Sequence, residues 1–122
     1  MKKLFTFPVI VRFGLACVFL ANSLTAFFSP SEFSDLISGS FVAGILSSIG
    51  LSVSAFITFV GCNDLTVSLL LLSGWKTSRV ATYATAWITT VVIVIGVNTL
   101  DALEHLGFIS MALSLALRGK RD

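Results

Sequence analysis

The sequence predicts an all-α integral membrane protein built as a bundle of four transmembrane helices. Apolar residues make up 56% of the 122 residues and charged residues only 11%, whereas a soluble domain carries about a quarter charged residues. The mean hydropathy is +1.00. Long apolar runs alternate with short polar segments. The chain therefore lacks the polar surface that water requires, and its length suits a single membrane domain over residues 1–122.

The first span is predicted over residues 8–28, because a helix needs about 20 apolar residues to cross the hydrocarbon core. Pro8 suits the first turn, where its missing N–H costs little. The polar stretch that follows predicts a short helix in the membrane interface, capped by Ser31, with Phe33, Leu36 and Ile37 facing lipid.

Residues 41–75 are too long for one span, because such a helix would measure about 50 Å against about 30 Å of hydrocarbon. Two interpretations are open. In the favoured one, residues 41–50 are interfacial or re-entrant and residues 51–75 form the second span, which Trp75 and the following lysine close as an interface anchor. In the other, residues 41–60 span and residues 65–75 lie at the cytoplasmic surface. Only the favoured interpretation buries Asp64.

The third and fourth spans are predicted over residues 80–97 and 100–117. The β-branched run of the third span would suggest a strand in water. Lipid forbids an open strand, because its backbone groups would be unpaired, so a helix is expected. Asp101 and Glu104 fall in the first turn of the fourth span, where the helix dipole favours acidic residues.

The positive-inside rule places both termini in the cytoplasm. In the four-span arrangement all eight basic residues fall on one side of the membrane, at the chain ends and in the second connection. The other two connections carry only acidic charges. The basic residues are Lys2, Lys3, Arg12, Lys76, Arg79, Arg118, Lys120 and Arg121.

Small residues at four-residue spacing predict close helix contacts, because lipid gives helices no hydrophobic reason to associate. Three such stripes are present. They are Gly44, Ser48 and Ser52; Thr82, Ala86 and Thr90; and Ala112 and Ala116.

Asp64 is the main candidate for chemistry, because a carboxylate inside hydrocarbon must be paired, protonated or hydrated. Arg12 is its predicted partner. At 1.5 Å per residue, Arg12 lies about 6 Å and Asp64 about 15 Å from the cytoplasmic end, a difference that a long side chain largely covers. A buried ion pair that fixes helix register and a proton-handling or quinone-contacting role both remain open.

Cys17 and Cys62 fall at similar depths, about 14 Å and 18 Å by the same rise. They form either a thiol pair or two small apolar side chains, and no C-x-x-C spacing supports a redox motif. Asn22 is a candidate for hydrogen bonding between helices or to a ligand headgroup, as is Asn98.

A cluster of Asp101, Glu104 and His105 begins the last helix, as a solvated helix start or, less favoured, a weak metal or proton-relay site. No metal site is predicted. No nucleophile-elbow, P-loop or zinc motif is present, and the basic residues do not form a nucleic-acid-binding face.

Three stretches resemble the DoxX-like family of small four-span bacterial membrane proteins. They are RFGLACVFL (12–20), LLLLSGWKTSRVA (69–81) and HLGFISMAL (105–113). Asp64 stands near the place where that family often carries a glutamate. The resemblance implies the bacterial inner membrane and a subunit or accessory of a quinone-linked or thiol and oxidative-stress redox system, with quinone as the implied cofactor. At most a non-catalytic or quinone-contacting subunit of an oxidoreductase is expected.

Two other functions stay open on the residues alone: an assembly protein without chemistry, and a component of a small transporter. The expected partners are the lipid bilayer and either a protein partner or further copies of the chain.

Overall fold

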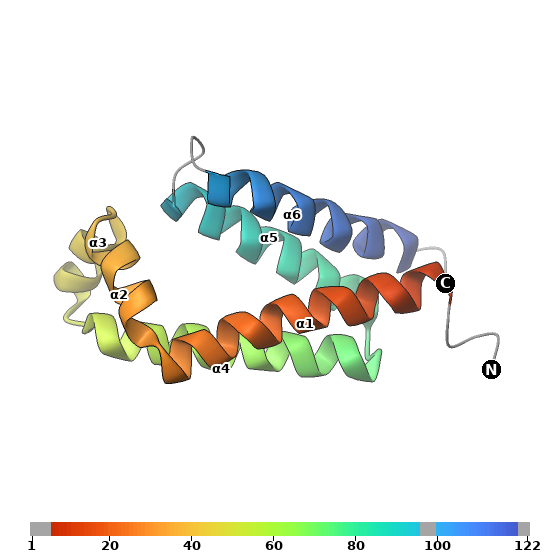
Figure 1. Cartoon of the computed structure of the whole chain (residues 1–122), viewed down its shortest axis with the longest axis horizontal. Helices are drawn as coiled ribbons and strands as arrows, with labels where there is room; N and C mark the ends of the chain where they lie inside the picture. The colour runs from red at the N-terminus through yellow and green to blue at the C-terminus, as the bar shows by residue number, and fades with distance from the viewer. Residues whose placement is uncertain (1–5, 96–99, 120–122) are drawn as a thin grey trace.

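The described part of the chain, residues 6–95 and 100–119 of the computed structural model, is entirely helical, which confirms the predicted all-α class. Four long helices, α1 (Phe7–Phe28), α4 (Val53–Ser73), α5 (Thr77–Ile95) and α6 (Leu100–Gly119), form the body of the molecule. Two short helices, α2 (Pro30–Ser38) and α3 (Val42–Ile49), lie between α1 and α4 at one end (Figure 1).

The break between α3 and α4 falls where the favoured interpretation of residues 41–75 puts it. Gly50 ends α3 with φ +73°, a left-handed conformation that favours glycine. Ser52 caps α4, because its hydroxyl accepts the amide N–H of Ala55 at 3.1 Å. Gly74 ends α4 in the same left-handed region, with φ +76°. Asp64 therefore belongs to the middle of one uninterrupted helix.

The long helices form two antiparallel pairs, α1 with α4 and α5 with α6, and the two pairs make fewer contacts with each other than each makes within itself (Figure 1). The start of α1, the end of α4, the start of α5 and the end of α6 all lie at one end of the molecule. The α2 and α3 helices lie at the opposite end. The connections predicted to carry basic residues therefore share one end.

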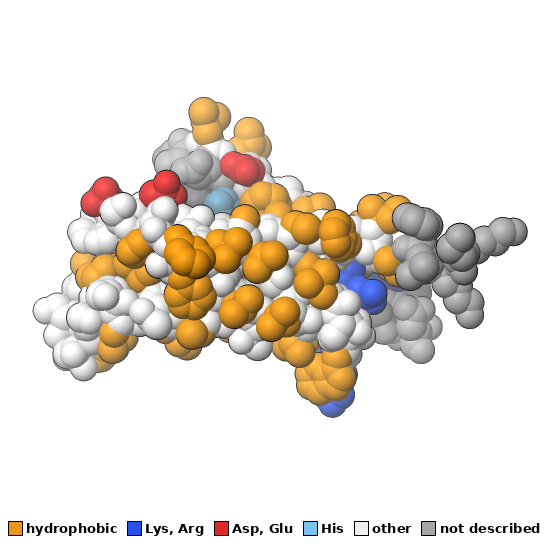
Figure 2. Space-filling view, turned by 60° about the horizontal axis from the view of Figure 1, so that its bottom comes forward, with side chains coloured by type: hydrophobic (Ala, Val, Ile, Leu, Met, Phe, Trp, Pro, Cys, Tyr) orange, Lys and Arg blue, Asp and Glu red, His pale blue; other side chains and the backbone are white. Residues whose placement is uncertain are grey.

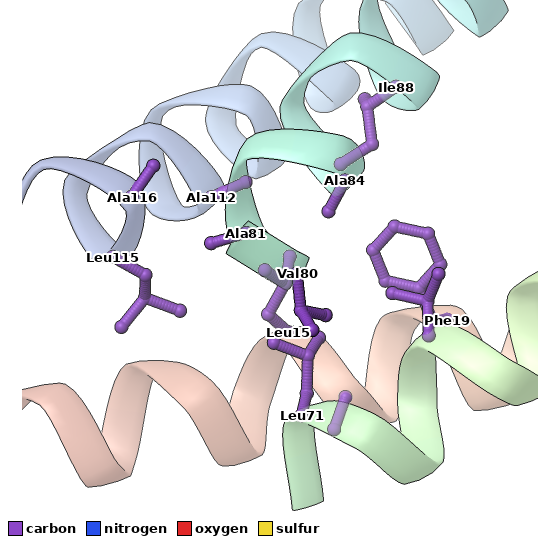
Figure 3. Packing of buried hydrophobic residues seen from close by; sticks show 12 residues of the cluster. Leu15, Phe19, Leu71, Val80, Ala81, Ala84, Ile88, Ala112, Leu115 and Ala116 are labelled. Atoms are coloured by element: carbon purple, nitrogen blue, oxygen red, sulfur yellow. The ribbon is translucent and has the colours of Figure 1, made fainter. Parts of the chain in front are cut away.

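The pairs meet at a core of buried apolar side chains (Figure 3). Leu15 and Phe19 of α1 and Leu71 of α4 are at most 2% exposed. Three alanines of α5 and α6, Ala81, Ala84 and Ala112, are fully buried in this core. Small side chains let two helix backbones approach closely.

Of the three predicted stripes of small residues, only Ala112 and Ala116 lie in a buried contact. The stripes at Gly44 and at Thr82 were wrong, because all of their members are exposed. Helix α5 buries Ala81, Ala84 and Ile88 instead. Spacing identifies a possible face, and the position of the neighbouring helices decides which face is covered.

Helices α2 and α3 fold back onto the α1–α4 pair through a second apolar cluster of Ala26, Ile37, Leu46 and Ile57. The prediction that Ile37 faces lipid was wrong, since it is 5% exposed. The N-cap of α2 is Ser29 and not Ser31, because Pro30 takes the first helical position.

Two helices, α1 and α4, are long and apolar enough to cross a membrane, as judged within the described residues. The outer surface of the bundle carries many large apolar side chains, among them Phe13 at 61% exposure, Phe59 at 53% and Leu103 at 66%. On the face in Figure 2, acidic side chains gather toward one end, basic side chains toward the other, and apolar side chains cover the surface between them.

Candidate functional site

A partly open cavity of about 380 Å³ lies between the two helix pairs. All four long helices and α2 contribute to its wall. The lining residues are Val18, Phe19, Asn22, Thr25, Glu32, Phe33, Leu36, Val60, Asp64, Trp87, Ile88, Val91, His105 and Phe108.

Asp64 is the most buried acidic group described, with 3% of its surface exposed. The amide Nδ2 of Asn63 donates to its Oδ1 at 3.1 Å. The indole of Trp87, whose only polar group is a donor, also interacts with the Asp64 carboxyl. The hydroxyl of Tyr83 donates to Oδ1 of Asn63. Helices α4 and α5 are thus joined by a polar network with Asp64 at its inner end.

The helical spacing explains why these groups meet. Tyr83 and Trp87 are four residues apart, so their rings lie on one face of α5, stacked with centroids 6.5 Å apart. Phe59 of α4 meets the Trp87 ring edge-on at 6.2 Å. These ring contacts join α4 and α5 beside Asp64.

Sequence reasoning did not identify Asn63, Tyr83 or Trp87 as partners of Asp64. The usable signal was the pair of aromatic residues with polar atoms at i and i+4 in a span with no other aromatic residue, one of them the chain's single tyrosine. It also missed Glu32 as a residue of the cavity wall. Glu32 is far from Asp64 in sequence, and only the fold of α2 brings it there.

The predicted pairing of Arg12 with Asp64 was wrong. The Arg12 guanidinium packs over Gly74 at the carboxyl end of α4, where a Cβ on Gly74 would lie 2.9 Å from Nη1. The reason is directional, because helical side chains lean toward the amino end of their own helix. In the antiparallel α1–α4 pair, Arg12 leans toward the basic end and Asp64 leans away from it. Arg12 instead meets the negative end of the α4 dipole.

Of the other candidate polar residues, the structure places some in the cavity wall and others outside it. Asn22 and His105 line the cavity with Asp64, and the His105 ring meets Phe108 edge-on at 5.5 Å. Glu104 is exposed. Asn98 lies outside the described residues, and of Asp101 only the backbone is described. Among described side chains, no three histidine, cysteine or acidic groups gather as a metal site.

Both Cys17 and Cys62 are exposed on the outside of the bundle as free thiols. Cys62 lines a second, more open groove of about 520 Å³ between α4 and α5, together with Phe59 and Tyr83. The structure therefore does not bring the two thiols together as a bonded pair.

Comparison of the chain with protein-family models, with curated proteins and with solved structures found no match.

Proposed function

We propose that the chain is a four-span protein of the bacterial inner membrane, with both termini in the cytoplasm, and that residues 41–50 lie at the opposite interface. Helices α5 and α6 support this proposal, because they are about as long as the two apolar spans, α1 and α4, and run beside them. The described basic residues Arg12, Lys76, Arg79 and Arg118 also belong to the same end of the bundle.

The hydroxyl groups on the outer surface give a second line of support. Exposed threonines on α4 and α5 donate to the carbonyl oxygen four residues earlier, as Thr66 does to Cys62 at 2.8 Å and Thr89 to Thr85 at 2.7 Å. Ser110 does the same on α6, to Leu106 at 2.9 Å. In water these hydroxyls have solvent partners, but in hydrocarbon an internal acceptor is required.

Single cysteines test this topology. In a variant with Cys17→Ala and Cys62→Ala, Ser38→Cys on α2 should react with a membrane-impermeant maleimide in spheroplasts. Ser73→Cys, at the end of α4, should react only after lysis. Equal labelling of the two positions from outside would exclude the proposed orientation.

Within the membrane, we propose a subunit or accessory role in a redox system, linked to quinone as the family resemblance implies. The observation that supports it most is a buried carboxyl, Asp64, in the wall of a cavity that also holds His105 and Asn22. An ionisable group at this depth is costly and therefore typical of a functional site. Its network holds the carboxyl in place, as proton exchange with a bound partner requires.

The experiment is purification in mild detergent followed by identification of co-purifying proteins and quinones. Asp64→Asn should keep the fold and the protein partner but abolish the redox activity of the complex. Asp35→Asn, an exposed α2 residue outside the cavity wall, is the matched control. A complex whose activity survives Asp64→Asn would indicate an assembly protein, and ion flux in liposomes that depends on Asp64 would indicate a transporter.

A further inference from the structure

The charge of the cavity wall is one-sided. Asp64 and Glu32 supply two carboxyl groups, and none of the lining residues is a lysine or an arginine. His105 is the remaining titratable group in the wall. The described basic side chains belong to the other end of the bundle, and the nearest of them in sequence to the wall, Arg12, is held at Gly74. A positive charge inside the cavity would therefore meet no basic lining residue that opposes it.

The same wall is aromatic on several sides. Phe19, Phe33, Trp87 and Phe108 come from α1, α2, α5 and α6, one from each helix. Phe19 also belongs to the buried core in Figure 3, and it is 2% exposed. Aromatic ring faces attract cations, and the attraction grows where water is excluded. Aromatic walls combined with carboxyl groups are the chemistry that recognises onium and ammonium ions.

We propose that this cavity binds a lipophilic organic cation, either an amphiphilic amine or a quaternary onium ion, with its charge beside Asp64 and its apolar groups against the aromatic rings. The proposal goes beyond the redox role and does not depend on it. A neutral quinone would bind through donors in the wall, such as the Asn22 amide and the Thr25 hydroxyl, whereas a cation would bind at the carboxyl groups.

Size and access agree with this ligand class. The volume of about 380 Å³ lies within the range of small-molecule pockets, roughly 300–1,000 Å³. Glu32 is exposed while it lines the cavity, so a carboxyl group stands at the opening as well as in the depth. In the proposed topology this opening faces away from the cytoplasm. A cation dissolved in the outer leaflet would meet Glu32 first and Asp64 afterwards.

Trp87 provides a reporter for binding, because its indole lines the cavity together with Asp64. Changing the other tryptophan, Trp75→Phe, leaves Trp87 as the only indole in the chain. The full chain in mild detergent is titrated with methyltriphenylphosphonium and, separately, with triphenylphosphine oxide, a neutral molecule of similar size. The cation should quench Trp87 fluorescence with saturation, and the neutral molecule should not.

Asp64→Asn should weaken cation binding by roughly tenfold or more, because an opposite charge a few ångströms away in a low-dielectric site is lost. Glu32→Gln should weaken it less, since Glu32 is partly screened by solvent. Asp35→Asn removes the same charge from α2 but does not line the cavity, so it should leave binding unchanged. Elution of each variant as a single species from size exclusion verifies the fold, and Glu32→Gln keeps the test valid should Asp64→Asn not fold.

Equal affinity for the cation and the neutral oxide, or cation binding that neither Asp64→Asn nor Glu32→Gln weakens, would overturn the proposal. Saturable quenching by decylubiquinone with none by the phosphonium would also overturn it, while supporting the quinone-linked function. Quenching by neither probe would overturn the cation proposal, and the redox role would still be judged by its own co-purification experiment.

Discussion

The α1–α4 contact should depend on two reciprocal serine hydrogen bonds. The hydroxyl of Ser23 on α1 donates to the carbonyl oxygen of Gly61 on α4 at 3.0 Å. The hydroxyl of Ser68 on α4 donates back to the carbonyl oxygen of Ala16 on α1 at 2.8 Å. Both serines are 0% exposed. The two bonds stand seven residues apart on each helix and fix the register of the antiparallel pair.

We expect Ser68→Ala to lower the free energy of unfolding by about 0.6–1.7 kcal/mol, the range for interhelical hydrogen bonds in membrane proteins. Ser23→Ala should do the same. Seven residues correspond to about 10 Å along a helix, a separation at which effects add. The double variant should therefore lose about 1–3 kcal/mol. Unfolding is measured by titrating sodium dodecyl sulfate into mild detergent micelles and following tryptophan fluorescence.

Ser110→Ala is the matched control. Its hydroxyl donates to Leu106 at 2.9 Å within the same helix, and its side chain is exposed. The substitution and the type of acceptor are the same, but no second helix is involved, so the change should be close to zero. A loss in Ser110→Ala as large as in Ser68→Ala, or an unchanged double variant, would refute the assignment of stability to this seam.

Three further predictions use the same unfolding measurement or a gel. Gly74→Ala should destabilise the fold by about 1–2 kcal/mol, because φ is +76° there. Gly44→Ala, in an open part of α3, should stabilise the fold by up to about 1 kcal/mol. A Gly44→Ala variant less stable than Gly74→Ala would contradict the helix ends described here. Ala112→Leu should cost about 1–3 kcal/mol by overpacking the α5–α6 contact, where Ala112 is 0% exposed, and an unchanged stability would show that the contact is looser than described. Oxidation should not change the non-reducing gel mobility of the protein, because Cys17 and Cys62 are exposed and free; an oxidant-dependent shift that Cys17→Ser abolishes would show a pair.

Composition and the length of the apolar runs were sufficient to predict that the long helices form. The predicted span of residues 8–28 differs from α1 by one residue at its start, and the last predicted span begins where α6 does, at Leu100. The favoured interpretation of residues 41–75 rested on the Trp75 anchor, and the structure shows a further local signal in Gly50 and Ser52, which end α3 and begin α4. Such signals act within a few residues of the chain, so the sequence displays them directly.

The partners of the polar side chains depended on tertiary structure. Equal depth suggested that Arg12 would meet Asp64, but depth contains no information on the direction in which a side chain leans or on which helix lies beside it. The same limitation applies to the small-residue stripe at Thr82, which faces outward. Each long helix has several faces that are apolar enough to pack, and the sequence does not rank them.

The amino-acid sequence by itself determined that this chain is helical, where its long helices lie to within about three residues at the described ends, and that the connections between them alternate between acidic and basic. These properties follow from local apolarity and helix-end chemistry. The tertiary structure alone decided that α1 pairs with α4 and α5 with α6. That pairing leaves a cavity whose wall brings together Glu32, Asp64 and His105 from three different helices. The physical reason is that packing in an apolar protein is selected by the fit between whole helix faces, and fit is a property of two surfaces together.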